Sequence, residues 1–403
     1  NDLTSLGAYL SIENNDVLTN IEGLNSLASI GEYLKIKSND ALINIGGLSS
    51  LTSIGEDFWI NNNDALTNIN GLSNLTSIEE YFWIYDNAAL NSLDGLSSLS
   101  SVSGGFRIES NPTLANLNGL GSLTSIPKYL SIENNDALTN LDALSNLASI
   151  EGSLVILANN ALNNLVGLNN LNSIEGNLTI RSTALTNLNG LSNLTSIGGH
   201  LLIESNIALT NLDALSNLTS IGDHLLIESN IALTNLDALS NLTSIGDYLK
   251  IYANDTLTNI DGLSNLSLIG GHLHITQNMS LNSCCIVPYL VSIMQGSVYS
   301  IQNAPGCNSL EEITDSCSMT TLQTIKETPS FHIYPNPNTG AFTIESKDLI
   351  KTLKIYNNIG QLIEEKEINA PTTKVNVPSI QTGIYFVAIE TETGTIVEKV
   401  LIQ

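Results

Sequence analysis

Apolar residues in the first 283 residues recur in a fixed unit that is longer than any helix or strand period. The unit reads L-x-x-L-x-x-L-x-x-L-x-x-I-x-x-x-L-x-I-x-x-N-x-x, and only its short L-x-I piece alternates with a period of two residues. Such self-similarity indicates an array of stacked units, each with at least one short strand. The leucine that opens each unit recurs every 24 residues, with one step of 23, at Leu18, Leu42, Leu66, Leu90, Leu114, Leu138, Leu162, Leu185, Leu209, Leu233, Leu257 and Leu281.

This period predicts a parallel β-solenoid. If each unit is one turn of a right-handed coil, its Leu and Ile side chains point inward and stack on those of the next turn, with strands about 4.8 Å apart. Roughly twelve such turns would form a rod on the order of 55 to 60 Å long. The stretch from His200 to Asp223 is repeated letter for letter from His224 to Asp247. Because a whole inserted turn preserves the stacking on both sides, we expect this part of the rod to be scaffold.

Asparagines form two further rows along the array. Those in the first row lie three residues after the strand isoleucine, at Asn15, Asn39, Asn63, Asn87, Asn111, Asn135, Asn159, Asn206, Asn230, Asn254 and Asn278. Buried amides can bond the unpaired backbone of a tight turn, and stacked copies form a ladder. Thr183 takes this position in the 23-residue unit, so we expect the ladder to break there. The second row, two residues after each opening leucine, is interpreted as turn chemistry.

The units resemble bacterial leucine-rich repeats of the receptor L-domain type, over about residues 1–283. The resemblance implies an all-β, right-handed β-solenoid. It also implies that the repeats bind ligands or act as spacers and seldom catalyse.

All four cysteines follow the last repeat, within residues 284–317. The last turn of a solenoid exposes an apolar end, so this segment is interpreted as a cap. A bond between the neighbours Cys284 and Cys285 would strain the peptide, and each is therefore expected to pair with Cys307 or Cys317. Free buried thiols are the alternative, whereas zinc lacks ligand-like spacing. Two disulfides would place the protein outside the cytoplasm.

A polar linker is expected over residues 318–330, and the 24-residue period is absent from residues 331–403. There, alternating strands separated by Gly, Pro and Asn predict a small antiparallel β-sandwich. This segment also resembles the type A C-terminal sorting domain of the type IX secretion system of the Bacteroidetes. The resemblance implies the secretion machinery as a partner, export across the outer membrane, and release or attachment at the cell surface. It rests on Pro335, Asn336, Pro337, Gly340, Ile355, Tyr356, Gly360, Gly383, Tyr385 and the closing VEKVLI.

Charge and hydropathy exclude several partners. With 39 acidic and 13 basic side chains, the formal net charge is −26, which disfavours binding to nucleic acid and to anionic lipid. No run of apolar residues is long enough to span a membrane. Because the chain begins at Asn1 within a repeat, without Met or a signal peptide, we expect that a further segment precedes it.

Side chains that flank the inward Leu and Ile of each strand should point outward and stack into columns. Both tryptophans of the protein fall in one such column on adjacent turns. With their neighbours they form an aromatic and basic patch, a candidate site for a protein or carbohydrate ligand. Cross-strand packing that only stiffens the sheet is an equal alternative. The candidate residues are Tyr33, Lys35, Trp59, Tyr81, Trp83, Tyr85 and Arg107, with Lys37 beside them.

No catalytic set emerges from the sequence. His200, His224, His272 and His274 share the outward face, but two of them are copies made by the duplication and none has a ligand at convincing spacing. A serine column has no accompanying base. We therefore expect no enzyme, no cofactor and no metal. The leading interpretation is a secreted or cell-surface protein for adhesion or ligand recognition. The alternative is a structural spacer or a subunit of a surface assembly, with self-assembly through an open coil end.

Overall fold

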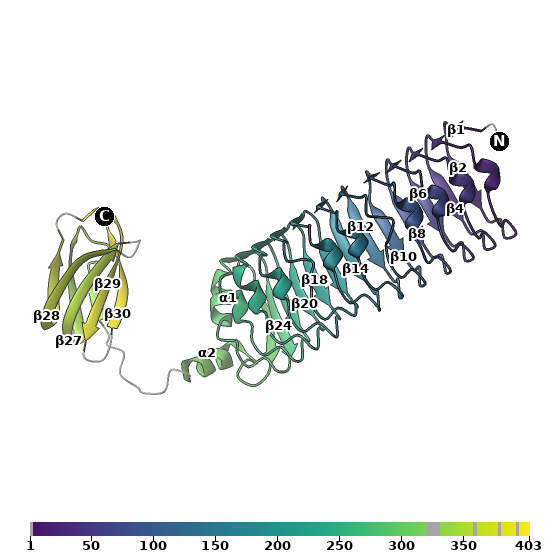
Figure 1. Ribbon diagram of the computed structural model, residues 1–403. Helices are drawn as coiled ribbons and strands as arrows, with labels where there is room; N and C mark the ends of the chain where they lie inside the picture. The colour runs from purple at the N-terminus through teal and green to yellow at the C-terminus, as the bar shows by residue number, and fades with distance from the viewer. Residues whose placement is uncertain (1–2, 320–330, 358–360, 378–379, 392–394) are drawn as a thin grey trace. The chain divides into compact units, whose positions relative to one another are not determined.

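The computed structural model describes residues 3–319, 331–357, 361–377, 380–391 and 395–403 (Figure 1). The chain forms two compact units, Asn1–Cys317 and Ser318–Gln403. Most of the expected linker, residues 320–330, lies outside the described residues.

The first unit is the predicted β-solenoid, and its main feature is one long parallel sheet. Each turn contributes one strand that pairs in parallel with the next; for example, Phe58 lies opposite Phe82 and Ile60 opposite Ile84. The register shifts only in the last pair, between Leu273 and His274 and between Thr276 and Asn278. The thirteen strands, in spatial and chain order, are β2 (Leu10–Glu13), β4 (Leu34–Lys37), β6 (Phe58–Asn61), β8 (Phe82–Tyr85), β10 (Phe106–Glu109), β12 (Tyr129–Glu133), β14 (Ser153–Leu157), β16 (Leu178–Arg181), β18 (Leu201–Glu204), β20 (Leu225–Glu228), β22 (Leu249–Tyr252), β24 (Leu273–Asn278) and β25 (Val298–Asn303).

Each turn also holds a second, two-residue strand, which starts at the serine column in all but one case. These strands form two more parallel sheets. The first contains β1 (Ser5–Leu6), β3 (Ser29–Ile30), β5 (Ser53–Ile54), β7 (Ser77–Ile78) and β9 (Ser101–Val102). The second contains β11 (Ser125–Ile126), β13 (Ser149–Ile150), β15 (Ser173–Ile174), β17 (Ser196–Ile197), β19 (Ser220–Ile221), β21 (Ser244–Ile245) and β23 (Leu268–Ile269). The serines are thus a structural position of the repeat.

Most turns include a single turn of 3-10 helix between the opening leucine and the short strand. The second asparagine row makes the predicted turn chemistry there: the Oδ1 atoms of Asn20, Asn44 and Asn68 accept the backbone N–H two residues further on. The helices are η1 (Glu22–Leu24), η2 (Gly46–Leu48), η3 (Asn70–Leu72), η4 (Asp94–Leu96), η5 (Asp142–Leu144), η6 (Val166–Leu168), η7 (Asp213–Leu215), η8 (Asp237–Asn241) and η9 (Asp261–Leu263).

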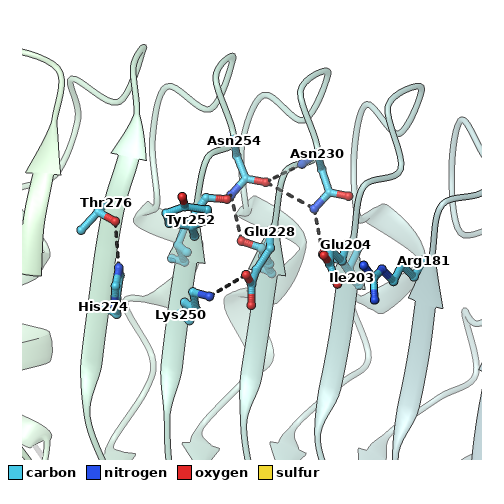
Figure 2. Close-up of polar contacts among 12 residues, drawn as sticks. Arg181, Ile203, Glu204, Glu228, Asn230, Lys250, Tyr252, Asn254, His274 and Thr276 are labelled. Carbon is cyan, nitrogen blue, oxygen red and sulfur yellow. Dashed lines mark hydrogen bonds and ion pairs between the residues drawn. The ribbon is translucent and has the colours of Figure 1, made fainter. Parts of the chain in front are cut away.

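The first asparagine row forms the predicted ladder at the bend after each long strand. The residue before each ladder asparagine has a left-handed backbone, as at Asn62 with φ of 55°, a conformation that costs non-glycine residues about 1 kcal/mol or more. The next side chain spans this bend, because Asn63 Nδ2 donates to the carbonyls of Asn61 and Ile36 at 3.1 and 3.0 Å. Figure 2 shows the same arrangement at Asn230 and Asn254, whose amides are joined at 3.3 Å.

The ladder is interrupted at the 23-residue turn, as predicted. Thr183 donates its hydroxyl to Asn206 Oδ1 at 2.7 Å and so joins the following turns. On its other side, the side chain of Asn159 donates only to the carbonyls of Ile132 and Leu157. Within the described residues, no amide of the ladder bonds Asn159 to Thr183.

The solenoid core is a continuous column of buried Leu and Ile, in which three phenylalanines replace the strand leucine on consecutive turns. Phe58, Phe82 and Phe106 are fully buried and stack in parallel, with 4.8 Å between successive ring centroids. Because these rings face inward, they position the outward residues of β6, β8 and β10 on a rigid base.

The cap closes the C-terminal end of the solenoid with two disulfides, as expected for a protein exported from the cytoplasm. Cys284 bonds to Cys307 and Cys285 bonds to Cys317, so no free cysteine is left. The cap includes α1 (Val287–Ile293) and α2 (Leu310–Met319), and β25 pairs with β24 as the last strand of the long sheet. Val287 and Leu290 of α1 are buried against the last turns.

The second unit is a curled antiparallel sheet of five strands. They are β26 (Phe331–Tyr334), β27 (Ala341–Asn357), β28 (Leu362–Asn376), β29 (Gly383–Thr391) and β30 (Thr395–Ile402). The first part of β27 pairs with β26, and its second part pairs with β29. The pairing with β28 is interrupted between Glu345 and Ile350, where β27 passes from one part to the other. The two parts share one core, which includes Phe342, Ile344, Leu353 and Val387.

Four residues of the sorting motif, Pro335, Asn336, Pro337 and Gly340, lie between β26 and β27, and the side chain of Asn336 ties that loop to the last strand. Asn336 Nδ2 donates to the carbonyl of Lys399, and the N–H of Leu401 donates to Asn336 Oδ1, both at 2.9 Å. Gly340 has φ of 90°, in the left-handed region that favours glycine. Of the remaining motif glycines, Gly383 begins β29, whereas Gly360 lies outside the described residues.

Candidate ligand-binding face of the solenoid

The outer face of the long sheet displays three columns of side chains. One column precedes the inward Leu or Phe, the second lies between it and Ile, and the third follows Ile. In the second column, register places Trp59 opposite Trp83, with Lys35 and Arg107 on their outer flanks. In the third column, Asn61 lies between Lys37 and Tyr85. The two adjacent tryptophans predicted from the sequence are therefore neighbours in the fold.

The aromatic side chains of the patch form one continuous chain of ring contacts. The ring centroids are 5.5 Å apart for Tyr33 and Trp59, 5.3 Å for the two tryptophans and 5.4 Å for Trp83 and Tyr81. The tyrosines at the two ends of this chain of rings were not among the candidates named from the sequence. Tyr9 stacks on Tyr33 at 4.6 Å, and Tyr129 stacks on Tyr81 at 5.9 Å. Both belong to the first outward column, so the column pattern could have included them.

The two tryptophans differ in how they are held. The indole N–H of Trp83 donates to the hydroxyl of Tyr129 at 2.6 Å, and burial raises the pKa of that hydroxyl above its usual range. Tyr81, stacked on Trp83, is covered by the Lys128 ammonium at 4.4 Å from its ring centroid. By contrast, the indole N–H of Trp59 has no hydrogen-bond partner among the described residues. Trp83 is therefore fixed within the sheet surface, and Trp59 keeps an available donor.

The basic residues of the patch also differ in whether they have a bonding partner. Lys35 is paired with Glu13 at 3.0 Å, and Arg107 with Glu109 at 2.6 Å. Burial raises the pKa of Glu109, while the positive charge of Arg107 opposes this effect. Lys37 makes no ion pair within the described part of the chain. Its neighbour in register is Glu13, whose carboxylate bonds to Lys35 and to the hydroxyl of Ser11. Lys37 is therefore the cation of the patch that lacks an ion pair among the described residues. Hydrogen bonds from Ser11 and Lys35 lower the pKa of Glu13, and the charge of Lys37 helps to lower it.

Two adjacent clefts open on this face. The first has a volume of about 270 Å³ and is lined by Tyr33, Lys35, Lys37, Trp59 and Tyr85. The second, of about 240 Å³, is lined by Trp59, Trp83, Tyr85, Arg107 and Glu109. Trp59 and Tyr85 thus border both. All the predicted candidates except Tyr81 line one of these clefts.

Asn61 is a member of this face that sequence reasoning missed. It lies between the two cleft-lining residues Lys37 and Tyr85 and is 1 % exposed. Its Nδ2 donates to Asn62 Oδ1 at 2.9 Å, but its Oδ1 has no partner, and neither has the buried Nε of Arg107. An unpaired buried polar atom costs about 1–3 kcal/mol. The sequence places an asparagine in an outward column, but it does not show that neighbouring side chains bury it.

A larger groove, of about 460 Å³, runs over the short strands β15, β17, β19 and β21. Serines and glycines such as Ser196, Gly198, Ser220 and Gly222 line most of it, and neither an aromatic ring nor a cation reaches it. We therefore favour the two smaller clefts as the ligand site, since their side chains offer rings, charges and unpaired polar atoms.

Within the described part of the chain, one group of side chains on the histidine turns has ligand atoms close enough together to hold a metal. Ligand atoms of Asp223, His224 and Asp247 lie within 4.8 Å of one another at the half-exposed surface. However, His224 Nδ1 already accepts the backbone N–H of Tyr248 at 3.4 Å. This arrangement repeats along the first column, where side chains such as Asp57 and His272 accept the N–H of the next turn. It therefore indicates a structural role for these side chains, and the absence of a metal stays a prediction.

Carboxylates on the same turns are also engaged with neighbours. Figure 2 shows Lys250 beside Glu228, at 2.6 Å, and Arg181 beside Glu204, at 3.1 Å. The ring of His274 contacts the hydroxyl of Thr276 at 2.8 Å. These pairs link successive outward residues across and along the strands, as cross-strand pairs do in other sheets.

Comparison with known families covers nearly the whole chain. Six copies of a BspA type leucine rich repeat region match within residues 1–106. The receptor L domain matches four overlapping segments, 100–171, 149–223, 170–237 and 217–319, which together span more than half of the chain. The secretion system C-terminal sorting domain matches residues 332–403. The chain is a leucine-rich repeat protein of the receptor L-domain type with a C-terminal sorting domain. No curated protein matches it significantly.

Two consequences follow for this leucine-rich repeat protein. Its sorting domain directs it through the type IX secretion machinery to the cell surface or into the medium. Its repeats belong to families whose members are typically non-catalytic. Among the described residues, no helix combines the length and the apolar character needed to cross a bilayer.

Proposed function

We propose that this secreted or surface-displayed repeat protein is a non-catalytic adhesion or recognition protein, and that it binds a protein or carbohydrate through the patch around Trp59. The observation that supports this function best is the pair of clefts that share Trp59 and Tyr85 as their common wall. Recognition sites combine aromatic surface with a few polar groups that fix orientation, and both are present here.

The two tryptophans differ in whether their indole N–H is hydrogen-bonded, and this difference supports a binding role for Trp59. Trp83 makes a hydrogen bond and two ring contacts, so packing within the sheet surface accounts for its presence. Trp59 has ring contacts but no partner for its indole N–H within the described residues. An aromatic ring with a free polar handle is typical of recognition surfaces. Packing and recognition are thus assigned to different members of the same column.

A structural spacer or a subunit of a surface assembly is the second candidate. The duplicated segment favours this role. Its strands β18 and β20 pair without a shift in register, from Leu201 opposite Leu225 to Glu204 opposite Glu228. An array that accepts a whole additional turn without a change of packing is suited to setting a length. Such a role requires no ligand in the clefts.

The test compares Trp59→Ala with the wild type in the purified full chain, by surface plasmon resonance on mucin, type I collagen and a set of oligosaccharides. Loss of an anchor residue should weaken binding at least tenfold, equivalent to about 1.4 kcal/mol. The melting temperature should change little, since Trp59 donates no hydrogen bond to the fold.

Leu202→Ala is the matched control, because Leu202 occupies the same outward column and is also half-buried. It should leave binding unchanged. If the wild type binds and Trp59→Ala binds equally well, the patch is not the site. If the wild type binds none of the probes and instead forms ordered multimers in sedimentation experiments, the spacer or assembly role replaces recognition.

A further inference from the structure

We propose that the two clefts bind an acidic oligosaccharide, with a sugar ring on Trp59, a hydroxyl donating to Asn61 Oδ1 and a carboxylate paired with Lys37. This inference rests on the proposed recognition function and names its ligand class. The carboxylate-bearing sugar is expected to be one member of a chain, since the two clefts lie side by side and share one wall.

The unpaired oxygen of Asn61 is the first step of the argument. Ladder asparagines nearby, such as Asn63 and Asn87, use both ends of their amides in bonds to other turns. Asn61 is as deeply buried as they are, yet its Oδ1 has no partner. Its neighbours in register, Lys37 and Tyr85, both line the first cleft. Asn61 itself lines neither cleft, so a hydrogen-bond donor of a ligand in the first cleft would reach this buried oxygen by displacing the side chains that cover it.

The donors around the clefts give the second step. Arg107 Nε is buried without a partner, and the indole N–H of Trp59 has none among the described residues. The face thus offers one unsatisfied acceptor and two unsatisfied donors around an aromatic ring. Sugar hydroxyls both donate and accept, so adjacent hydroxyls can serve both kinds of group. The C–H face of a sugar ring is apolar and flat, as stacking on an indole requires.

A peptide fits this face less well. Extended peptides bind by adding a strand to a free sheet edge, and helices lie in long apolar grooves. These clefts open on the face of the sheet, where β4, β6 and β8 each have a neighbour on both sides. The two clefts are short and meet at Trp59 and Tyr85, which line both. Their form suits successive rings of a chain.

The charges limit the ligand to a weakly acidic sugar. Lys35 and Arg107 are already paired with Glu13 and Glu109, and Lys37, which lies opposite Glu13 in register, makes no ion pair of its own among the described residues. One such cation suits one carboxylate. A densely sulfated chain would bring many negative charges close to a protein whose net charge is −26. The structure therefore favours uronic-acid sugars over sulfated or fully neutral ones.

The experiment is isothermal titration of the full chain with three tetrasaccharides: one with a single galacturonate among neutral hexoses, one of alternating glucuronate and N-acetylhexosamine, and one of glucose. Carboxyl-reduced forms of the first two are titrated beside them. At least one uronic tetrasaccharide should bind at least tenfold more tightly than its reduced form. Lys37→Met, which keeps the aliphatic stem, should abolish this preference without weakening the reduced form. Asn61→Leu, which removes the acceptor at similar volume, should weaken both forms tenfold or more.

Lys250→Met serves as the control and should leave all affinities unchanged, because Lys250 is paired with Glu228 on a distant turn and lines neither cleft. Equal affinity for native and reduced sugars, or full binding by Asn61→Leu, would overturn the inference. Trp59→Ala separates this failure from that of the proposed function. If no uronic sugar binds but collagen or mucin protein binds in a Trp59-dependent way, recognition stands and the sugar assignment is wrong. If Trp59→Ala preserves every interaction of the wild type, both are wrong.

Discussion

Replacing Asn87 with alanine should reveal how much the asparagine ladder contributes to stability. In the wild type, Asn87 Nδ2 donates to the carbonyls of Ile60 and Tyr85, both at 3.0 Å, and to Asn111 Oδ1 at 3.2 Å. Its Oδ1 accepts the backbone N–H and the amide of Asn63, both at 3.2 Å. All five bonds are lost in Asn87→Ala.

The magnitude follows from which partners are left without a bond. The backbone N–H of Asn63 becomes a buried donor with no partner, at a cost of about 1–3 kcal/mol. The side-chain amide of Asn63 keeps its bonds to two carbonyls, so losing its bond to residue 87 costs less than orphaning the backbone N–H. The four other partners are the Asn63 amide, the carbonyls of Ile60 and Tyr85, and Asn111 Oδ1. Adding about 0.5–1 kcal/mol for each of them gives a total loss of about 3–7 kcal/mol. The backbone at Asp86, with φ of 55°, would in addition lose the amide that bridges it.

Asn15→Ala is the matched control at the exposed first position of the ladder. Its amide donates to the carbonyl of Glu13 and to Asn39 Oδ1, each at 3.0 Å. Water can replace these bonds, so we expect a loss below about 1 kcal/mol. Urea unfolding followed by circular dichroism should be combined with hydrogen exchange of residues 58–111, because repeat arrays can unfold in parts. If Asn87→Ala loses no more stability than Asn15→Ala, the ladder is not a major source of stability.

Three further outcomes are expected. Peptide mapping of the oxidised protein should find no free thiol and should show Cys285 bonded to Cys317. Reduction should lower the free energy of unfolding by about 2–4 kcal/mol per bridge. A labelled thiol in the unreduced, denatured protein would contradict the disulfide-bonded cap. Deleting residues 331–403 should leave the solenoid folded but retained in the periplasm, and efficient appearance of the truncated form outside the cell would count against the sorting role. Burial, together with the nearby His224, lowers the pKa of His200 in the folded state. Neutral His200 therefore contributes stability above its unfolded-state pKa of about 6.5, and this stability is lost as the pH falls towards and through its folded-state pKa. His200→Gln should therefore lose less stability than the wild type between pH 7.5 and 5.5 in urea titrations, and equal losses would contradict this account.

The repeat made the solenoid predictable in detail. A fixed step of 24 residues determines which side chains stack, so the inward Leu and Ile, the ladder and its break at Thr183 could all be predicted without knowledge of any contact. The same periodicity placed Trp59 beside Trp83. The sequence excluded a bond between the neighbours Cys284 and Cys285, but it did not decide which of them bonds to Cys307 and which to Cys317. That choice depends on the positions of the cap helices, which the repeat does not predict.

What the periodicity could not supply is the interaction of each outward side chain with its neighbours. Trp59 and Trp83 occupy equivalent positions in the repeat, yet only Trp83 meets a tyrosine hydroxyl. That difference depends on Tyr129, which is two turns away and approaches because Gly105 has no side chain on the turn between; a Cβ at Gly105 would lie 2.4 Å from the Tyr129 ring. The burial of Asn61 likewise depends on how the side chains around it fold over. Such contacts arise from rotamers and not from period.

The interruption at Thr183 makes one joint of the rod weaker under tension than the others. Strand hydrogen bonds of a solenoid run along its axis, so a pull from end to end loads every junction between turns in series. Within the described residues, the junction between Asn159 and Thr183 lacks the amide bond that reinforces the others. Each detached turn of 24 residues would release about 80 Å of chain. We therefore expect force spectroscopy to record extension in steps of that size, beginning at this joint, so that the rod would respond to a sudden load by lengthening turn by turn.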